Sequence, residues 1–456
     1  MYDAGDKTVK RKQIDFTQGN IILELVMFSI PIVLGELFQN LYNSVDTLVV
    51  GNFVGKNALA AVSVCATLAN LLVGFFNGMS VGSSVVVSRA FGSRNGERLN
   101  RSMRVAFGFS VALGVVLSAL GILLTPVLVG LAAVPAEVYP EAVTYLRIYL
   151  AGLMFTVIYN ISAGILRAVG DSGTPFRILV ITSMINIVLD LAFVVVIPLG
   201  VAGVGFATIF SQFISVVLAY RKIGKINEEF RLDVKEAFQN RDIVAEVAAI
   251  GMPSGLQSAL ISFSNLFVWR YVNGFGATAA AGVGVAQRLD KFIVLPCKAF
   301  GLTITTFVSQ NSGAGNHARA RQGEGRCLLL SIVVTNSIGF LVYCFADWSV
   351  ALFNTDPEVI AYGVAMMHYI IPMYTLMAIR EIYLGILRGY GNTRIPMILS
   401  LTGMVVVRQI YLAVSMSINR TIENVYFCYP MAWGVTAALI FIYYQIVKKR
   451  YREDLG

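Results

Sequence analysis

The chain has 456 residues, of which 57% are hydrophobic and only 13% are charged, and its mean hydropathy is +0.72. A soluble domain of this length carries roughly 25% charged residues, so the composition excludes an ordinary water-soluble globular protein. The formal net charge of +9 would by itself allow nucleic-acid binding, but the positions of the charges argue against it.

Apolar blocks long enough to cross a bilayer follow one another along the whole chain. A transmembrane helix needs about 20 consecutive, mainly apolar residues, and these blocks reach that length. The predicted spans are residues 21–50, 57–88, 103–130, 138–166, 176–198, 201–220, 243–272, 279–309, 327–352, 357–387, 396–417 and 424–447. The sequence therefore predicts an all-α polytopic membrane protein with twelve transmembrane helices, surrounded by the lipid bilayer.

Lys and Arg residues are concentrated in alternate loops. Most of the 35 basic residues lie in one set of segments, residues 1–20, 89–104, 167–177, 221–241, 317–326, 388–394 and 448–456. The loops of the other side hold only Lys56, Arg147 and Arg420. Short loops rich in Lys and Arg stay on the cytoplasmic side of a membrane, so both termini are expected to be cytoplasmic. The excess of Lys and Arg thus reflects the orientation of the chain in the membrane, and no nucleic-acid partner is expected.

Processing signals and cofactor motifs do not stand out in the sequence. The first 20 residues are polar and the first apolar block is too long for a signal-peptide core, so we expect a multi-pass protein of the plasma (inner) membrane. The five cysteines form no closely spaced pairs and no zinc motif. We expect no cofactor, and no metal beyond Na+ if that ion drives the protein.

Polar side chains recur every three or four residues within the first span, at Glu36, Gln39, Asn40, Asn43, Asp46 and Thr47. This is the helical period, so they share one face of the helix. A charged side chain in a bilayer costs roughly 2.5–3.5 kcal/mol on insertion scales and usually marks function. We expect the stripe to line a water-filled path, with Asp46 as the coupling charge at its outer end. Pro31 lacks a backbone donor and predicts a bend in this span, either a static kink or a moving hinge.

The two halves of the chain resemble each other. "GILRAVGDSGTP" at 164–175 aligns without a gap with "GILRGYGNTRIP" at 385–396, and "AFGSRNGER" at 90–98 aligns with "NSGAGNHAR" at 311–319. Six spans in each half give parallel repeats about an axis along the membrane normal, with a substrate path between them. The alternative is a duplicated structural bundle with no transport role. The predicted domains are an N-terminal six-helix bundle (1–220), a cytoplasmic linker (221–242) and a C-terminal six-helix bundle (243–456).

Three polar residues of the first half align with apolar or aromatic residues of the second. The aligned pairs are Asp46 with Phe267, Asn186 with Val407, and Asp190 with Tyr411. The helical rise of 1.5 Å per residue places Asp46, Asp190 and Thr208 at one level in the outer half of the N-terminal bundle. Carboxylate, amide and hydroxyl oxygens suit a hard monovalent cation, and a buried carboxylate also suits a proton. We expect an H+ or Na+ coupling site at Asp46, Asn186, Asp190 and Thr208; the alternative is that these side chains satisfy one another and hold helices together.

The second half carries charges of its own inside its spans. They are Arg288, Asp290, Lys291, Lys298, Arg380, Glu381 and Arg408. Together they make the interior of the C-terminal bundle net basic, opposite an acidic N-terminal bundle. One interpretation is a cavity wall that binds an anionic or zwitterionic part of a substrate. The other is internal ion pairing, such as Arg408 with Glu381 or Arg288 with Asp290.

These features resemble the multidrug and toxic compound extrusion (MATE) family of efflux transporters, nearer its DinF-like branch, over the whole chain. The resemblance rests on "QNLYNSVDTLVVG" in the first span, the paired "LRAVGDSGTP" and "LRGYGNTRIP", and "NIVLD" followed by "GVAGVGFAT". It implies an antiporter in which inward H+ or Na+ movement drives export of small amphipathic compounds by alternating access. In that branch the cation site is matched by Asp46, Asn186, Asp190 and Thr208, and the bend of the first span is matched by Pro31. Other branches place a coupling acid in span 7, where this chain has none between Glu246 and Asp290.

Two other functions remain open at this stage. A flippase for lipid-linked or polysaccharide precursors belongs to the same superfamily, and a basic cavity would suit phosphate. An integral membrane enzyme would need a nucleophile–base pair or a metal cluster at one level, and the chain has only two histidines, His317 and His368. We therefore expect a transporter, not an enzyme. Its expected partners are small-molecule substrates, anionic or zwitterionic as well as cationic, and the expected state is a monomer.

Overall fold

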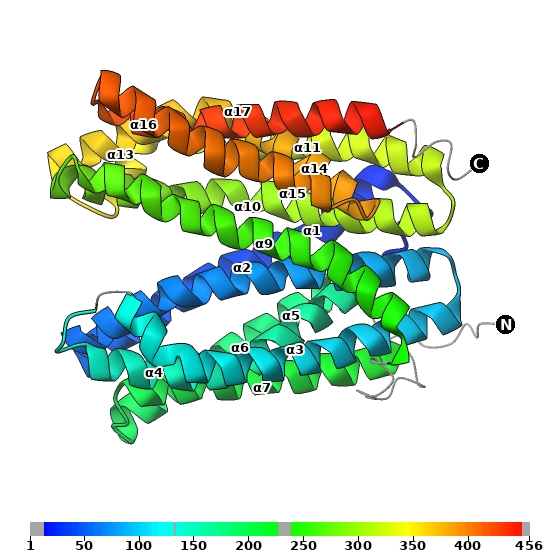
Figure 1. The fold of residues 1–456 in the computed structure, drawn as a ribbon, viewed down its shortest axis with the longest axis horizontal. Coiled ribbons are helices and arrows are strands. Elements are labelled where there is room, and N and C mark those ends of the chain that lie inside the picture. The colour runs from blue at the N-terminus through cyan, green and yellow to red at the C-terminus, as the bar shows by residue number, and fades with distance from the viewer. Residues whose placement is uncertain (1–12, 132–133, 227–238, 449–456) are drawn as a thin grey trace.

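The computed structural model describes residues 13–131, 134–226 and 239–448, the side chains of 66–71 and 131 excepted. Every regular element in these ranges is a helix (Figure 1). In chain order they are α1 (Ile21–Val49), η1 (Val50–Val54), α2 (Lys56–Gly92), α3 (Gly96–Leu131), α4 (Tyr139–Ala151), α5 (Leu153–Ala168), α6 (Gly173–Leu191), η2 (Ala192–Val196), α7 (Val201–Ile226), α9 (Arg241–Asn273), α10 (Ala277–Gly313), α11 (His317–Cys344), α12 (Ala346–Ala351), α13 (Pro357–Ile370), η3 (Ile371–Met373), α14 (Tyr374–Gly389), α15 (Arg394–Leu401), η4 (Thr402–Val407), α16 (Arg408–Ile418) and α17 (Ile422–Val447). The elements η1, η2 and η4 are π-helical, and η3 is a 3-10 turn.

Ten helical spans in the described ranges are long and apolar enough to cross a bilayer. Helices α4 and α5 meet at a bend of 43° and together form an eleventh candidate. Helix α2 has 37 residues. At 1.5 Å per residue, its length exceeds the thickness of a bilayer's hydrocarbon core. The bent pair and α2 occupy the fourth and second of the predicted spans. The chain is thus an integral, multi-pass, all-α membrane protein.

Helical structure extends into both ends of the predicted linker 221–242. Helix α7 continues to Ile226, through the first residues of the predicted linker 221–242, and α9 begins at Arg241. Apolar periodicity ends where the bilayer ends, but a helix can continue into water with charged residues. The remaining linker positions, 227–238, lie outside the described residues.

The duplicated sequence motif folds into the same turn in both halves. After α5, Gly170 has a φ of +84° and its N–H donates to the carbonyl oxygen of Arg167 at 2.9 Å. After α14, Gly391 has a φ of +73° and its N–H donates to the carbonyl oxygen of Arg388 at 2.8 Å. Only glycine adopts this left-handed conformation without strain, which explains the glycine in both copies.

We call the end of the molecule that carries the α2–α3, α5–α6, α10–α11 and α14–α15 turns the basal end, and the opposite end the apical end. Helix α17 also ends toward the basal end, at the right of Figure 1. The two halves meet there at backbone distance, since a Cβ on Gly313 of α10 would lie 2.2 Å from the carbonyl oxygen of Arg89 in α2. A Cβ on Gly92 would lie 1.9 Å from the carbonyl oxygen of Gln310 in α10. Small residues allow helices to approach this closely in membranes. We refer to these two glycine contacts as the basal contact.

Helix α1 connects the two halves. Its first turns pack on the second half, because Leu25 and Phe28 share a hydrophobic cluster with Phe300 of α10. Its later turns pack on the first half, where Gly35 faces Leu179 of α6. Each half has one large apolar cluster of its own, and a smaller cluster joins α2 and α3 of the first half to α9 of the second. Pro31 therefore lies in α1 between a part held by one half and a part held by the other.

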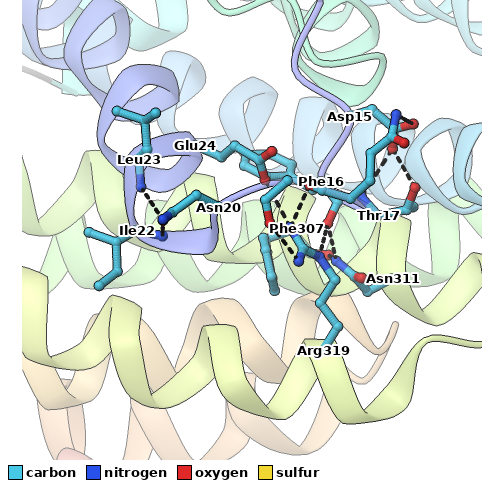
Figure 2. Close-up of polar contacts among 12 residues, drawn as sticks. Asp15, Phe16, Thr17, Asn20, Ile22, Leu23, Glu24, Phe307, Asn311 and Arg319 are labelled. Atoms are coloured by element: carbon cyan, nitrogen blue, oxygen red, sulfur yellow. Dashed lines mark hydrogen bonds and ion pairs between the residues drawn. The ribbon is translucent and has the colours of Figure 1, made fainter.

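The segment that precedes α1 passes between the two halves at the basal end (Figure 2). Ile14 donates its N–H to the carbonyl oxygen of Gly170 in the first half at 3.1 Å. Phe16 is fully buried against the rings of Phe28 and Phe307, with centroid distances of 5.0 and 5.3 Å. Its N–H donates to Gln310 Oε1 at 3.0 Å, in the second half. A segment that the sequence marks only as polar is thus part of the packed basal end.

One arginine of the second half holds this segment by its backbone. Arg319 of α11 donates to the carbonyl oxygens of Phe16 at 2.8 Å, Gln18 at 2.5 Å and Gly19 at 2.9 Å. It also pairs with Glu24 in the first turn of α1 at 3.0 Å. All five side-chain N–H groups of an arginine form a fixed fork, so one residue can bind several carbonyls at once.

Replacing Arg319 by glutamine is expected to release the N-terminal segment. The variant loses the cation that binds three carbonyls and Glu24, and hydrogen bonds to charged groups contribute ~1.5–3 kcal/mol each. We expect the detergent-solubilised variant to melt about 5 °C below the parent protein in a thermal unfolding scan. Arg326→Gln changes an exposed arginine of the same helix and serves as the control. Equal melting temperatures for the two variants would rule out a structural role for Arg319.

Candidate functional site

Two carboxylates of the first half lie toward the apical end, each just before an α-helix becomes a π-helix. Asp46 is four residues before the π-helical η1, and Asp190 is two residues before the π-helical η2. These two π-helical elements contact each other. A π-turn widens the helix locally and is frequent at functional sites, because it reorients the side chains beside it.

Asn186, Asp190 and Thr208 form one hydrogen-bonded group. Asn186 and Asp190 are one helical turn apart on α6, and each is only 1% exposed. With its amide oriented to suit both neighbours, Asn186 donates from Nδ2 to Asp190 Oδ2 at 3.1 Å and accepts the backbone N–H of Thr208 at 3.3 Å. The Thr208 hydroxyl donates to the carbonyl oxygen of Val204 at 3.0 Å within α7. An amide that contacts both helices fixes the position of the carboxylate.

Asp46 completes this group from α1. Its carboxyl group lies within hydrogen-bonding reach of that of Asp190. Oδ1 of Asp46 and Oδ1 of Asp190 are both buried and have no hydrogen-bond partner among the residues that the structure describes. Two carboxylates so close together repel each other unless a proton or a cation lies between them. The structure thus brings together all four residues predicted for the coupling site, and the group can chemically hold H+ or Na+.

Three tyrosines surround the carboxylates, and the sequence analysis did not include them. Tyr42, one turn before Asp46 on α1, lies beside Asp46, Asp190 and Thr208. Tyr145 and Tyr149 of α4 stack on each other with centroids 6.2 Å apart, and Tyr145 also lies close to Asp46. Tyr42 and Tyr145 thus place aromatic rings beside the carboxylates. The four-residue spacing of Tyr42 to Asp46 was a signal in the sequence that could have identified the first of them.

The rest of the polar stripe of α1 is at most half-buried. Glu36 and Asn40 are half-buried, and Gln39 and Asn43 are exposed. Within the described ranges, none of these four side chains forms a hydrogen bond. Polar groups that face lipid without a partner are costly, so a stripe of this kind requires water along that face. Glu36 is also near the charge of Arg167 at the end of α5.

Pro31 does not interrupt α1, which is helical from Ile21 to Val49. Bending at this position is not visible in one conformation, so the hinge stays a prediction. The position of Pro31, between the turns that pack on α10 and those that pack on α6, is where a change in the angle between the halves would be absorbed.

The charges of the second half form different pairs from those expected. The predicted pairs Arg408 with Glu381 and Arg288 with Asp290 are both wrong. Glu381 pairs instead with its chain neighbour Arg380, and Asp290 accepts the hydroxyl of Tyr374. Residues two apart on a helix point to nearly opposite sides, which is why Arg288 cannot reach Asp290. Arg288 and Lys291 are exposed, and Arg408 is buried.

Comparison with known proteins matches both halves of the chain to one family. The model of the family described as MatE matches residues 31–192 and 253–414. The Probable multidrug resistance protein YpnP of Bacillus subtilis (strain 168) is 29% identical over 401 residues, which cover 87% of this chain and 89% of that protein.

Solved structures with the same fold cover nearly the whole chain. An outward-facing multidrug resistance MATE family transporter of the MOP superfamily has a TM-score of 0.88 at 21% identity, covering 98% of this chain and 100% of that one. A MOP superfamily transporter from Pyrococcus furiosus Vc1 (DSM3638), for which a reverse polarity of the binding pocket is described, has a TM-score of 0.87 at 22% identity with the same coverage. At these identities the likeness shows the fold.

Proposed function

Because this chain belongs to the MatE family, whose members are transporters and not enzymes, we propose that it is a secondary multidrug efflux antiporter. In this proposal, H+ or Na+ moving into the cell drives the export of small amphipathic organic compounds. The observation that carries it is the pair of carboxylates Asp46 and Asp190, each with a buried oxygen that lacks a partner in the described part of the chain. A relative named as a multidrug resistance protein supports the substrate class.

The coupling step follows from the electrostatics of this pair. Without an ion, the carboxylates of α1 and α6 repel each other across their shared space. A proton or a sodium ion removes the repulsion and allows Asp46, and with it the apical part of α1, to lie against Asp190. Asn186 and Thr208 keep Asp190 in place, so the movement belongs to α1. Binding of the ion is thereby linked to the position of a helix that touches both halves.

Alternating access would then depend on α1, because this helix packs on both halves of the chain. In this proposal, the basal contact closes the basal end, and the substrate path opens toward the apical end. Movement of α1 at Pro31 would pull on the turns packed against α10 and on the N-terminal segment held by Arg319. We place the protein in the plasma (inner) membrane as a monomer, with the basal end and both termini in the cytoplasm. The exposed stripe of α1 would form one wall of the path.

Reconstitution into vesicles with separately imposed pH and Na+ gradients tests the proposal. We expect one of the two gradients to drive accumulation of an amphipathic probe such as ethidium, and dissipation of that gradient by an ionophore to stop it. Vesicles without protein provide the background. Failure of both gradients to move cationic, zwitterionic and anionic amphipathic probes would refute the antiporter. Translocation of a fluorescent lipid-linked precursor under those conditions would instead identify a flippase.

A further inference from the structure

Two arginines are buried inside the C-terminal bundle. Arg408 is the first residue of α16, directly after the π-helical η4, and is 1% exposed. Arg380 of α14 is 6% exposed. The two guanidinium groups are close enough to repel each other. Buried charges in proteins are normally paired, so this arrangement needs compensation.

The hydrogen-bond and ion-pair partners of these two arginines do not fully compensate their charges. Arg408 donates from Nη2 to Ser264 Oγ of α9 at 2.8 Å and forms no ion pair with any carboxylate of the described residues. Arg380 pairs with Glu381, and Asp290, the acid near Tyr429, binds the hydroxyl of Tyr374 and forms no ion pair with either arginine in the described residues. The Nε–H groups of Arg408 and Arg380 both lack an acceptor in the described ranges.

The neighbouring hydroxyl groups also have protons to donate. Ser264 Oγ accepts from Arg408 and from Gln409 Nε2 at 3.0 Å, and its own proton has no acceptor in the part of the chain that the structure covers. The hydroxyl of Tyr429, close to Arg408, accepts from Gln287 Nε2 at 2.9 Å. Its own proton also has no acceptor among the described residues. Helices α9, α14, α16 and α17 thus bring donors together without matching acceptors.

The alignment of the two halves places this cluster opposite the coupling site. The alignment that joins 164–175 to 385–396 also joins Thr208 to Tyr429, and Asn186 to the residue before Arg408. Where the first half has two carboxylates with unpartnered oxygens, the second half has two guanidinium groups with unpartnered N–H groups. The corresponding regions of the two halves therefore carry opposite charges, although the charged residues themselves do not align with one another.

We propose that the C-terminal bundle contains a binding site for a small inorganic anion of the halide class, formed by Arg408 and Arg380 with the hydroxyls of Ser264 and Tyr429. An anion between the two guanidinium groups removes their repulsion and accepts the free donor protons. The burial of Arg408 and Ser264, each 1% exposed, favours a single-atom anion over the head group of a large substrate. The proposal does not depend on which cation drives transport.

Thermal unfolding of the detergent-solubilised protein in mixtures of sodium chloride and sodium gluconate tests this site. Ionic strength and Na+ stay constant in these mixtures, so only the anion changes. We expect the melting temperature to rise saturably with chloride. Arg408→Met should lose this dependence and, in gluconate alone, should melt no lower than the parent because it no longer buries an unpaired charge. Arg326→Gln, at an exposed arginine, should keep the full dependence.

A milder pair of variants covers the case in which Arg408→Met does not fold. Ser264→Ala and Tyr429→Phe each remove one donor and keep the shape, and each should raise the half-saturating chloride concentration about tenfold. A parent protein that ignores chloride, or a chloride effect that is equal in the parent and these variants, would overturn the proposal. Stabilisation by formate but not by chloride would also overturn it, and would assign the two arginines to the carboxylate of a substrate.

Discussion

Replacing Asp190 by asparagine is expected to reduce ion-driven export to the background of protein-free vesicles. The change keeps the shape of the side chain and its contact with Asn186, but it removes the charge that must bind or release the ion. Asp46→Asn should have the same effect, because the two carboxylates act as a pair across α1 and α6. The measurement is gradient-driven uptake of the probe that the parent transports, at matched amounts of reconstituted protein.

The matched control is Asp347→Asn, which makes the same chemical change at an exposed acid of α12. It should transport at the parent rate. If Asp46→Asn and Asp190→Asn also export at the parent rate, the coupling site lies elsewhere. If both lose transport but also fail to fold, as judged by their melting temperatures, their buried oxygens have a structural role instead.

Replacing Gly92 by alanine is expected to disrupt the basal contact and to slow transport strongly. The added Cβ would lie 1.9 Å from the carbonyl oxygen of Gln310, and a backbone atom cannot rotate away as a side chain can. On the other side of the same contact, a Cβ on Gly313 would lie 2.2 Å from the carbonyl oxygen of Arg89. Overpacking of this kind costs ~1–3 kcal/mol or more. Because the cost falls on the basally closed state, the equilibrium between the two access states should shift away from it.

Gly96→Ala is the control for this experiment. It lies four residues further along the chain, and nothing is within 4 Å of the position where its Cβ would be. It should keep the parent melting temperature or raise it slightly, because alanine is the better helix former. The readouts are probe transport and the melting temperature. Gly92→Ala transport equal to that of Gly96→Ala would mean that the basal contact does not limit the cycle.

Several features were accessible to the sequence alone because they depend on local composition or on rare residues. The length of apolar blocks determines which segments can span a bilayer, and the structure has helices at all of those positions. The few charged side chains within the spans were visible for the same reason. The helical rise placed Asp46, Asp190 and Thr208 at one level, because helices that cross the same bilayer start and end at the same two surfaces. The comparison of the two halves added Asn186.

The pairing of side chains across helices was decided by the tertiary structure. Sequence patterns indicate which residues share a face of one helix, but not how that helix is rotated against its neighbours. This is why the expected pairing of Arg408 with Glu381 was wrong, and why Tyr145 was missed although it lies beside Asp46. The N-terminal segment is a stronger case, because nothing local marks Phe16 as buried. Its burial depends on two halves of the chain closing around it, and only the folded arrangement of both halves contains that information.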